Sequence, residues 1–266
     1  NVTCDINNEN CTISMKFADK IPYKDVTVVY AVGNSPNAAT SASRLGLSSG
    51  IVTNMGDDKN GTDCLATLTE NGIDTSFVTR HSGSKTNYHY VLNYGAERTI
   101  LIKHEPYNYV FTAPTEAPSW IYLSSVGERT IDYHNQIADY LEANPEIKLA
   151  FQPGTFQMKL GIEKLAPIYK RANVFVCNVE EAQRILNSKE TDVKVLMDKI
   201  HTLGPKIVAI TNGPKGAYVS DGEQALFMPI YPDPKAPVSR TGAGDAFAST
   251  FVSAISMGKS VQEALM

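Results

Sequence analysis

Apolar residues along this chain follow two patterns that alternate over most of its length. Short runs of β-branched and aromatic residues, such as "WIYLSSVG" (120–127) and "NVFVCN" (173–178), have the pattern of buried strands. Segments such as "VKVLMDKIHTLG" (193–204) instead place apolar residues at helical spacing. The same two patterns predict further strands at 27–33, 48–56, 148–154 and 206–213, and further helices at 35–46, 61–73, 135–144 and 179–187.

This alternation of strands and helices predicts an α/β fold with a parallel sheet covered by helices on both faces. Ligands of such sheets bind beyond the carboxyl ends of the strands. Candidate functional residues are therefore expected in the loops that follow Val32, Phe151, Cys177, Ile210 and Val238.

Two segments interrupt the alternation with β-hairpin patterns. Residues 1–21 form the first, and residues 86–106 form the second, with "NYGAER" as its turn. We expect an α/β core at 26–85 and 106–266, and an accessory β-sheet lid at 1–25 and 86–105 that covers a binding crevice. An exposed lid edge also predicts pairing with a second copy of the chain as a homodimer.

Composition narrows the class of partner. The chain has 266 residues, a formal net charge of −4 and a pI near 5.8, which argue against nucleic acid or an anionic membrane as the main partner. No apolar run approaches the roughly 20 residues that cross a bilayer. The four cysteines contain no CxxC pair, so we expect reduced thiols in a cytoplasmic protein.

The stretch "VSRTGAGDAFASTF" (238–251) carries the clearest chemistry. Apolar residues recur at helical spacing after Asp245, so a helix is expected to begin near this residue. Free N–H groups at such a helix entrance suit an anion, and Asp245 could accept a proton from a hydroxyl that attacks phosphorus. Taken alone, an Asp in this place more commonly stabilises the helix dipole only. The entrance consists of Gly242, Ala243 and Gly244.

Two other glycine-rich motifs do not fit this stretch. A dinucleotide-binding G-x-G-x-x-G motif would need a glycine where Phe247 stands, and it would lie near the start of the chain. A phosphate-binding G-x-x-x-x-G-K-S loop at "SAISMGKS" would need a glycine at Ser253. Both readings fail.

Four motifs in order resemble the ribokinase-like (PfkB) carbohydrate kinases over nearly the whole chain. They are "VGNSPNAATSASRLG", "CNVEEA", "ITNGPKGA" and "TGAGDAF". The resemblance implies a ribokinase-like three-layer α/β/α fold with a mostly parallel central sheet and a small β-sheet lid. It also implies ATP-dependent transfer of the γ-phosphoryl group to a hydroxymethyl group of a sugar or nucleoside.

The resemblance assigns roles residue by residue. Asp245 matches the catalytic base, and Gly242, Ala243 and Gly244 match the anion hole. Asn178 and Glu181 match the family's N-x-x-E, which organises Mg²⁺ and phosphates largely through water, although the same pair has the pattern of a helix-capping box. The nucleotide segment corresponds to Thr211, Gly213 and Gly216, which read alone predict a turn between strands.

Residues for the acceptor are expected in two places. Gly33, Asn34 and Asn37 match the family's substrate segment, and an Asn-Pro helix start explains them equally well. In the lid, Asn87, His89 and Arg98 are candidates to face a sugar.

Three departures from the family pattern concern the site. Ser239 and Arg240 replace the first two residues of the usual D-T-T-G-A-G-D, which leaves potassium activation in doubt. Gln152 and Lys159 stand where relatives carry an acidic or Asn residue and a basic one. The family's first strand, whose Asp binds the acceptor hydroxyls, is expected before Asn1.

The sequence therefore predicts an ATP- and Mg²⁺-dependent kinase of a small sugar. A nucleoside kinase is the alternative within the family, because the tyrosines of the lid could form a slot for a base. A catalytically idle ligand-binding homologue is the alternative outside it, since Ser239 and Gln152 depart from the pattern.

Overall fold

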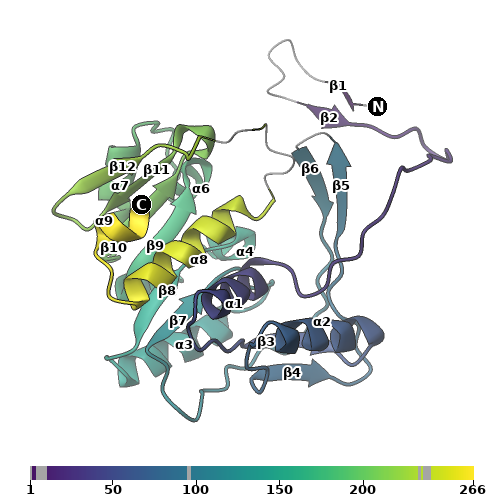
Figure 1. Cartoon of the computed structure of the whole chain (residues 1–266), viewed down its shortest axis with the longest axis horizontal. Coiled ribbons are helices and arrows are strands. Elements are labelled where there is room, and N and C mark those ends of the chain that lie inside the picture. Colours follow the sequence, from purple (N-terminus) through teal and green to yellow (C-terminus); the bar gives the residue numbers. More distant parts are fainter. Residues whose placement is uncertain (1, 4–10, 95–96, 233–234, 236–240) are drawn as a thin grey trace.

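The computed structural model describes residues 2–3, 11–94, 97–232, 235 and 241–266. Its centre is a six-stranded sheet with the strand order β12-β11-β10-β9-β8-β7 (Figure 1). Neighbouring strands from β7 to β10 are parallel, while β11 and β12 are antiparallel additions at one edge. The expected mostly parallel sheet is confirmed. The strands are β7 (Trp120–Leu123), β8 (Lys148–Phe151), β9 (Ala172–Asn178), β10 (Ile207–Thr211), β11 (Ala217–Ser220) and β12 (Ala225–Met228).

Alternate residues of these strands face two separate hydrophobic cores. In β9, Phe175 and Cys177 belong to one core, and Val174 and Val176 belong to the other. Because side chains of a strand alternate between its faces, an apolar run of this kind needs a helical layer on each side. One layer contains α3 (Ile131–Ala143), α4 (Thr155–Leu160), α5 (Ala166–Arg171), α6 (Val179–Ile185) and α7 (Val193–His201); the other contains α8 (Ala243–Ser256) and α9 (Val261–Leu265).

The amino-terminal part of the core adds a smaller unit. Here α1 (Asn34–Arg44) packs on α8, while α2 (Lys59–Glu70) packs on β3 (Thr53–Gly56). Strand β3 pairs in parallel with β4 (Val78–His81), and this pair is not hydrogen-bonded to the six-stranded sheet among the described residues. Its own core contains Ala39, Ile51, Met55, Leu68 and Ile73.

The prediction of a strand at residues 27–33 is wrong. These residues form no strand, and Val28, Val29 and Val32 are 49%, 61% and 60% exposed. A run of β-branched residues favours a strand only when a neighbouring strand offers backbone partners and side-chain contacts. Here no described strand pairs with the run, and the chain passes directly into α1.

Both expected hairpins are present, but they do not join into one sheet. Strand β1 (Val2–Thr3) pairs with β2 (Thr12–Ile13), and β5 (Tyr90–Tyr94) pairs with β6 (Glu97–Leu101). These are two separate two-stranded sheets, so the single accessory sheet that we expected is not formed by the described residues. Figure 1 shows β5 and β6 rising from the core as a narrow arm, the lid. Residues 95–96 of its turn, and Val238, Ser239 and Arg240, lie outside the described residues.

Two further expectations concern thiols and membranes. Cys64 and Cys177 are free thiols as expected, but Cys11 is disulfide-bonded, which corrects the expectation of reduced thiols throughout. The number of cysteines and their spacing in the sequence do not determine which thiols lie close together in the fold. Within the described ranges, none of the helices has the length and apolar character needed to span a membrane.

Candidate active site

The amino-terminal end of α8 forms an open entrance for an anion. Gly242 is the N-cap in the left-handed region (φ 81°), and among the described residues no side-chain cap is found for the helix. The first bond within the helix runs from Ala246 N to Gly242 O at 2.8 Å, so the preceding N–H groups have no partner inside α8. Ala243 and Gly244 are exposed, and a methyl group added to Gly244 would meet no atom within 4 Å. This geometry fits an anion at the helix dipole.

Asp245 lies in the first turn of α8 and is held by three side-chain amides. Asn34 Nδ2 donates to Oδ1 at 2.9 Å, and Asn37 Nδ2 donates to Oδ2 at 2.8 Å. Gln152 Nε2 also approaches Oδ1, at 3.4 Å. Each donor is a neutral amide N–H, and each fixes one oxygen of the carboxylate in place. The structure thus brings together a carboxylate from α8, two amides from α1 and one from the loop after β8.

The position of α1 explains why both of its amides reach Asp245. Gly33 precedes the helix with φ 124°, a conformation that a residue with a side chain rarely adopts. Ser35 Oγ is 2.7 Å from Ser124 Oγ, which joins the start of α1 to the end of β7. Asn34 and Asn37 are three residues apart and therefore share a face of the helix. Their expected contact with a sugar stays a prediction, and their observed partner is the carboxylate.

Gln152 follows β8 directly and is fixed by β7. Its backbone N donates to Leu123 O at 2.9 Å, and its Oε1 accepts from Tyr122 Oη at 2.6 Å. Burial raises the pKa of Tyr122 and the negative charge of Asp245 raises it further, so this hydroxyl stays protonated. Lys159, the other departure in this segment, lies on α4 with Nζ 5.2 Å from the centre of the Phe156 ring.

A buried histidine supports the turn that carries Gln152. His134 Nδ1 lies 2.6 Å from Thr130 O, so it is the protonated nitrogen, and Nε2 accepts from Gln157 Nε2 at 2.9 Å. Gln157 Oε1 in turn accepts from Gly154 N at 2.7 Å. Burial lowers the pKa of His134, outweighing the hydrogen bond to Thr130. The neutral imidazole is therefore part of the turn between β8 and α4.

The next strand end along the sheet carries the expected N-x-x-E pair. Asn178 Oδ1 accepts from Glu181 N at 2.8 Å, and Glu181 Oε2 accepts from Asn178 N at 2.9 Å. The capping box is thus confirmed, and one oxygen of Glu181 remains outside it. Burial raises the pKa of Glu181, and among smaller effects the charge of Asp245 raises it as well.

The loop after β10 is brought beside this pair by strand register. Thr211 is the register partner of Asn178, so the two loops leave the sheet at the same edge. The loop contains the short 3-10 helix η1 (Gly213–Lys215) and closes with Asn212 N donating to Gly216 O at 2.8 Å. Gly213 and Gly216 have positive φ values of 50° and 100°, and a methyl group on Gly216 would collide with the backbone of Met228. Both glycines are required by the turn itself.

Two residues of the lid that were expected to contact the sugar instead link its two limbs, the outgoing segment that leads into β5 and the returning segment that follows β6. Asn87 Oδ1 accepts from Glu105 N at 2.7 Å, and His89 Nδ1 accepts from Lys103 N at 3.1 Å. Burial lowers the pKa of His89, and the neighbouring His104 lowers it further. These side chains are structural in the described molecule, and their contact with an acceptor stays a prediction. Arg98 on β6 has a buried Nε with no hydrogen-bond partner among the described residues.

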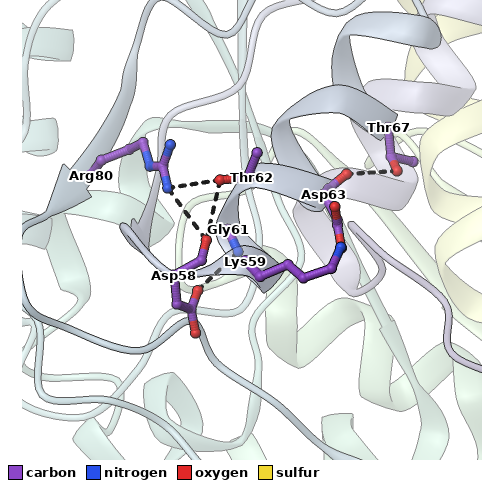
Figure 2. A network of polar contacts seen from close by, with 7 residues as sticks. All are labelled: Asp58, Lys59, Gly61, Thr62, Asp63, Thr67 and Arg80. Atoms are coloured by element: carbon purple, nitrogen blue, oxygen red, sulfur yellow. Dashed lines mark hydrogen bonds and ion pairs between the residues drawn. The ribbon is translucent and has the colours of Figure 1, made fainter.

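Sequence reasoning did not identify Asp58, which joins α2 to the base of the lid. Asp58 Oδ1 accepts from Gly61 N at 3.0 Å as the N-cap of α2, and Thr86 donates to the same carboxylate from N and Oγ1. Arg80 approaches the carbonyl of Asp58 and Oγ1 of Thr62, and Lys59 pairs with Asp63 (Figure 2). The signal was present as "GDDKNG", an Asp directly before a helical segment.

Burial alone would raise the pKa of Asp58, but the hydrogen bonds from Thr86 and Gly61, together with the charge of Arg80, lower it. A carboxylate with these partners is a fixed structural group. We therefore assign Asp58 to the framework around the site, at the point where the lid leaves the core.

A metal at this site would not be caged by protein ligands alone. In the part of the chain that the structure describes, no group of three or more His, Cys, Asp and Glu side chains could hold a metal ion. The charge of Asp245 nevertheless contributes to the raised pKa of Glu181, so the two carboxylates interact electrostatically. Two neighbouring carboxylates without an all-protein cage fit Mg²⁺, which keeps several waters and binds through few carboxylates together with phosphates.

Comparison with known proteins identifies the family and the fold. The pfkB family carbohydrate kinase profile matches residues 2–266. The ribokinase of Bacillus subtilis is 28% identical over 88% of this chain and 76% of its own length. Among solved structures, the Arabidopsis thaliana ribokinase with ribose and ATP has a TM-score of 0.70 at 21% identity, covering 93% of this chain and 83% of that chain. The Burkholderia thailandensis nucleoside kinase with inosine has a TM-score of 0.70 at 16% identity, covering 88% and 76%. The expected ribokinase-like fold and enzyme class are confirmed, and the chain belongs to the pfkB family of carbohydrate kinases.

Proposed function

We propose that this protein transfers the γ-phosphoryl group of ATP to a hydroxymethyl group of a small sugar, with Asp245 as the general base. The observation that carries the proposal is the position of Asp245. Its carboxylate lies in the first turn of α8, beside the open helix entrance, and is oriented by three amides. A base and an anion-binding entrance at one place are what attack of a hydroxyl on phosphorus requires.

The residues of the chain divide the chemistry between them. Asp245 accepts the proton of the acceptor hydroxyl, and the N–H groups at Ala243 and Gly244 stabilise negative charge on the transferring phosphoryl group. Asn34 and Asn37 fix the direction of the carboxylate. The lid excludes water that would otherwise compete with the acceptor.

ATP and Mg²⁺ are assigned to the adjoining strand ends. Thr211, Gly213 and Gly216 line the turn after β10 that would hold the nucleotide, next to Asn178 and Glu181. Mg²⁺ would be held by Glu181 through water and by the phosphates, and when bound it neutralises phosphate charge. The carboxylate oxygen of Glu181 that stays outside the capping box supports this assignment, because Mg²⁺ prefers hard oxygen ligands.

We favour a sugar over a nucleoside because the groups near Asp245 are amides. Hydroxyl-rich acceptors are recognised by convergent polar groups. The amide nitrogens of Asn34 and Asn37 donate to Asp245, and the Oδ1 atoms of the same two side chains are left to accept from acceptor hydroxyls. The ribokinase name of the Bacillus subtilis relative supports the same choice. A nucleoside remains the second candidate, because Tyr88 and Tyr90 form an edge-to-face pair in the lid with ring centres 5.2 Å apart, which a base could contact.

The test measures ADP release with a panel of sugars and nucleosides, for the wild type and for Asp245→Asn. We expect a sugar with a free hydroxymethyl group to give the largest kcat/KM. Asp245→Asn should lower kcat by roughly 10²–10⁴-fold, with ATP affinity changed little. Asp139→Asn, on the exposed side of α3, is the control.

Each alternative has its own result in this experiment. A nucleoside as the best acceptor would move the assignment to nucleoside kinase. Tight binding of one acceptor without ADP release would favour the idle homologue. Unchanged kcat in Asp245→Asn would remove Asp245 from the mechanism.

A second proposal concerns assembly. The lid exposes Tyr90, Leu101 and Ile102 at 63%, 52% and 60%, an apolar surface that a second lid could cover. Homodimerisation through the lid therefore stays a prediction, and sedimentation of the wild type against Leu101→Lys measures it. A monomeric wild type at micromolar concentration contradicts it.

A further inference from the structure

Asp245 has a third amide partner in addition to Asn34 and Asn37. Gln152 Nε2 approaches Asp245 Oδ1 at 3.4 Å. It does so from the loop after β8, whereas Asn34 and Asn37 come from α1. The carboxylate is therefore held from two independent parts of the fold.

The orientation of the Gln152 amide is determined by Tyr122. The Tyr122 hydroxyl lies 2.6 Å from Gln152 Oε1 and donates to it. Since that oxygen is taken, the nitrogen of the same amide must point the other way, toward Asp245. The backbone of Gln152 is held by β7 as well, because Gln152 N donates to Leu123 O at 2.9 Å. Without the hydroxyl, the amide could rotate and present its oxygen to the carboxylate.

The distribution of donors leaves Asp245 able to accept a proton. A carboxylate has about four lone-pair directions, two on each oxygen. Oδ1 has two donors, Asn34 and Gln152, while Oδ2 has one, Asn37, among the described residues. Gln152 therefore holds the carboxylate by one oxygen and does not fill the other.

We propose that Gln152 is a positioning residue for Asp245, and that Tyr122 acts through Gln152 by fixing the direction of its amide. The proposal rests on the proposed function, in which Asp245 is the general base. It adds a neutral donor to the carboxylate, the amide of Gln152, whose direction is set by a tyrosine on the neighbouring strand.

The first experiment is a double-mutant cycle in kcat with Gln152→Leu, Tyr122→Phe and the double variant. Gln152→Leu should lower kcat by about tenfold or more, since small errors in placing a catalytic group are costly, and should change the KM for ATP little. Tyr122→Phe should have a smaller effect. In the double variant the loss should equal that of Gln152→Leu alone, because Tyr122 then has no amide to orient.

Two further variants distinguish donation from packing. Gln152→Glu keeps the oxygen that accepts from Tyr122 and replaces the donor with a second carboxylate oxygen, so it should lose more activity than Gln152→Leu. Tyr140→Phe removes a hydroxyl from α3, where the ring packs against Phe111, and should match the wild type. Equal activity of Gln152→Glu and wild type, or losses in the cycle that multiply, would overturn the proposal.

The second experiment does not depend on turnover. Carbon-13 NMR of side-chain-labelled aspartate follows the carboxyl resonance of Asp245, which is assigned by its loss in Asp245→Asn. Because loss of a hydrogen-bond donor changes the electronic environment of the carboxyl group, the resonance at one fixed pH should shift in Gln152→Leu and in Tyr122→Phe, and should keep its wild-type position in Tyr140→Phe. An unchanged chemical shift in both variants overturns the positioning role.

The two proposals fail in different ways. If Asp245→Asn retains full turnover, the proposed function fails, and the carboxyl chemical shift still decides whether Gln152 holds the carboxylate. If Asp245→Asn is inactive while Gln152→Leu has wild-type kcat and the wild-type carboxyl chemical shift, only the positioning role fails.

Discussion

Asn37 on α1 donates to Asp245 on α8 at 2.8 Å, although the two residues are 208 positions apart in the sequence. Because α1 packs along α8, the contact between these two helices determines where the carboxylate points. The site is thus built on helices, whose side chains are placed more precisely than those of loops. The entrance at Gly242 belongs to the same helix, so base and anion site keep a fixed separation.

Three glycine variants separate backbone strain from anion binding. Gly242 and Gly258 have φ values of 81° and 83°, so alanine at either should lower the free energy of unfolding by about 1–2 kcal/mol. Of these two variants, only Gly242→Ala should also lower kcat, because Gly258 lies at the far end of α8. Gly244→Ala should keep wild-type stability and lose activity, since its methyl group enters the space left for the phosphate. Urea unfolding and ADP release measure both properties, and full activity of Gly244→Ala would place the anion elsewhere.

Glu181→Gln tests the carboxylate assigned to Mg²⁺. Glutamine keeps an oxygen for Asn178 N, so the capping box survives while the charge is lost. The Mg²⁺ concentration for half-maximal activity should rise several-fold, whereas Glu180→Gln, on the exposed side of α6, should leave it unchanged. Equal Mg²⁺ dependence in the two variants would remove Glu181 from the metal site.

The same substitution has a consequence for stability. Burial raises the pKa of Glu181 in the folded protein, so the native state binds the proton more tightly than the unfolded state. Stability from this group is then lost as pH rises, and at neutral pH the charge is destabilising. Glu181→Gln should therefore unfold at a higher urea concentration than the wild type at pH 7.

His134 predicts a loss of stability in mild acid. Burial lowers its pKa in the folded state, so the neutral imidazole is favoured there and the unfolded state binds the proton more tightly. This contribution is complete above about pH 6.5 and is lost as pH falls from there through the lower folded-state pKa. Urea unfolding between pH 8 and pH 5 should give a steeper decline for the wild type than for His134→Gln. Parallel declines would show that another group titrates.

Asp58→Ala should weaken the base of the lid. It removes the N-cap of α2, worth about 0.5–2 kcal/mol, and it also leaves Thr86 N and Oγ1 without their acceptor. Asp63→Ala is the control from the same network, because its pair with Lys59 is on the surface and contributes little. Thermal unfolding compares them, and equal melting temperatures would contradict the role of Asp58.

Local pattern was sufficient for the strands that are buried on both faces and for α3, α6 and α7, but it did not identify the short helices α4 and α5 between β8 and β9. It failed at residues 27–33, because Val28 and Val29 favour a strand only beside a partner, and periodicity carries no information about partners. Strands β11 and β12 were not identified, since their antiparallel pairing at the sheet edge breaks the alternation from which the core was predicted.

Most residues of the candidate site could be predicted from the sequence, but the contacts between them could not. Asp245, Asn34 and Asn37 were each found from motifs, but nothing local indicates that the two amides donate to the carboxylate. Gln152 was recognised only as a departure, because its meaning depends on Tyr122, which sits on the next strand. His134 gave no signal, since a histidine buried among hydrogen bonds is indistinguishable in sequence from an exposed one.

The cross-bonding of the lid has a mechanical consequence. Asn87 and His89 join the outgoing limb to the returning limb, and Tyr107 Oη donates to Lys85 O at 2.6 Å just below them. Two limbs fastened to each other at three levels cannot slide past one another or curl separately. We therefore expect any movement of the arm to take place as one rigid unit about its root beside Thr86.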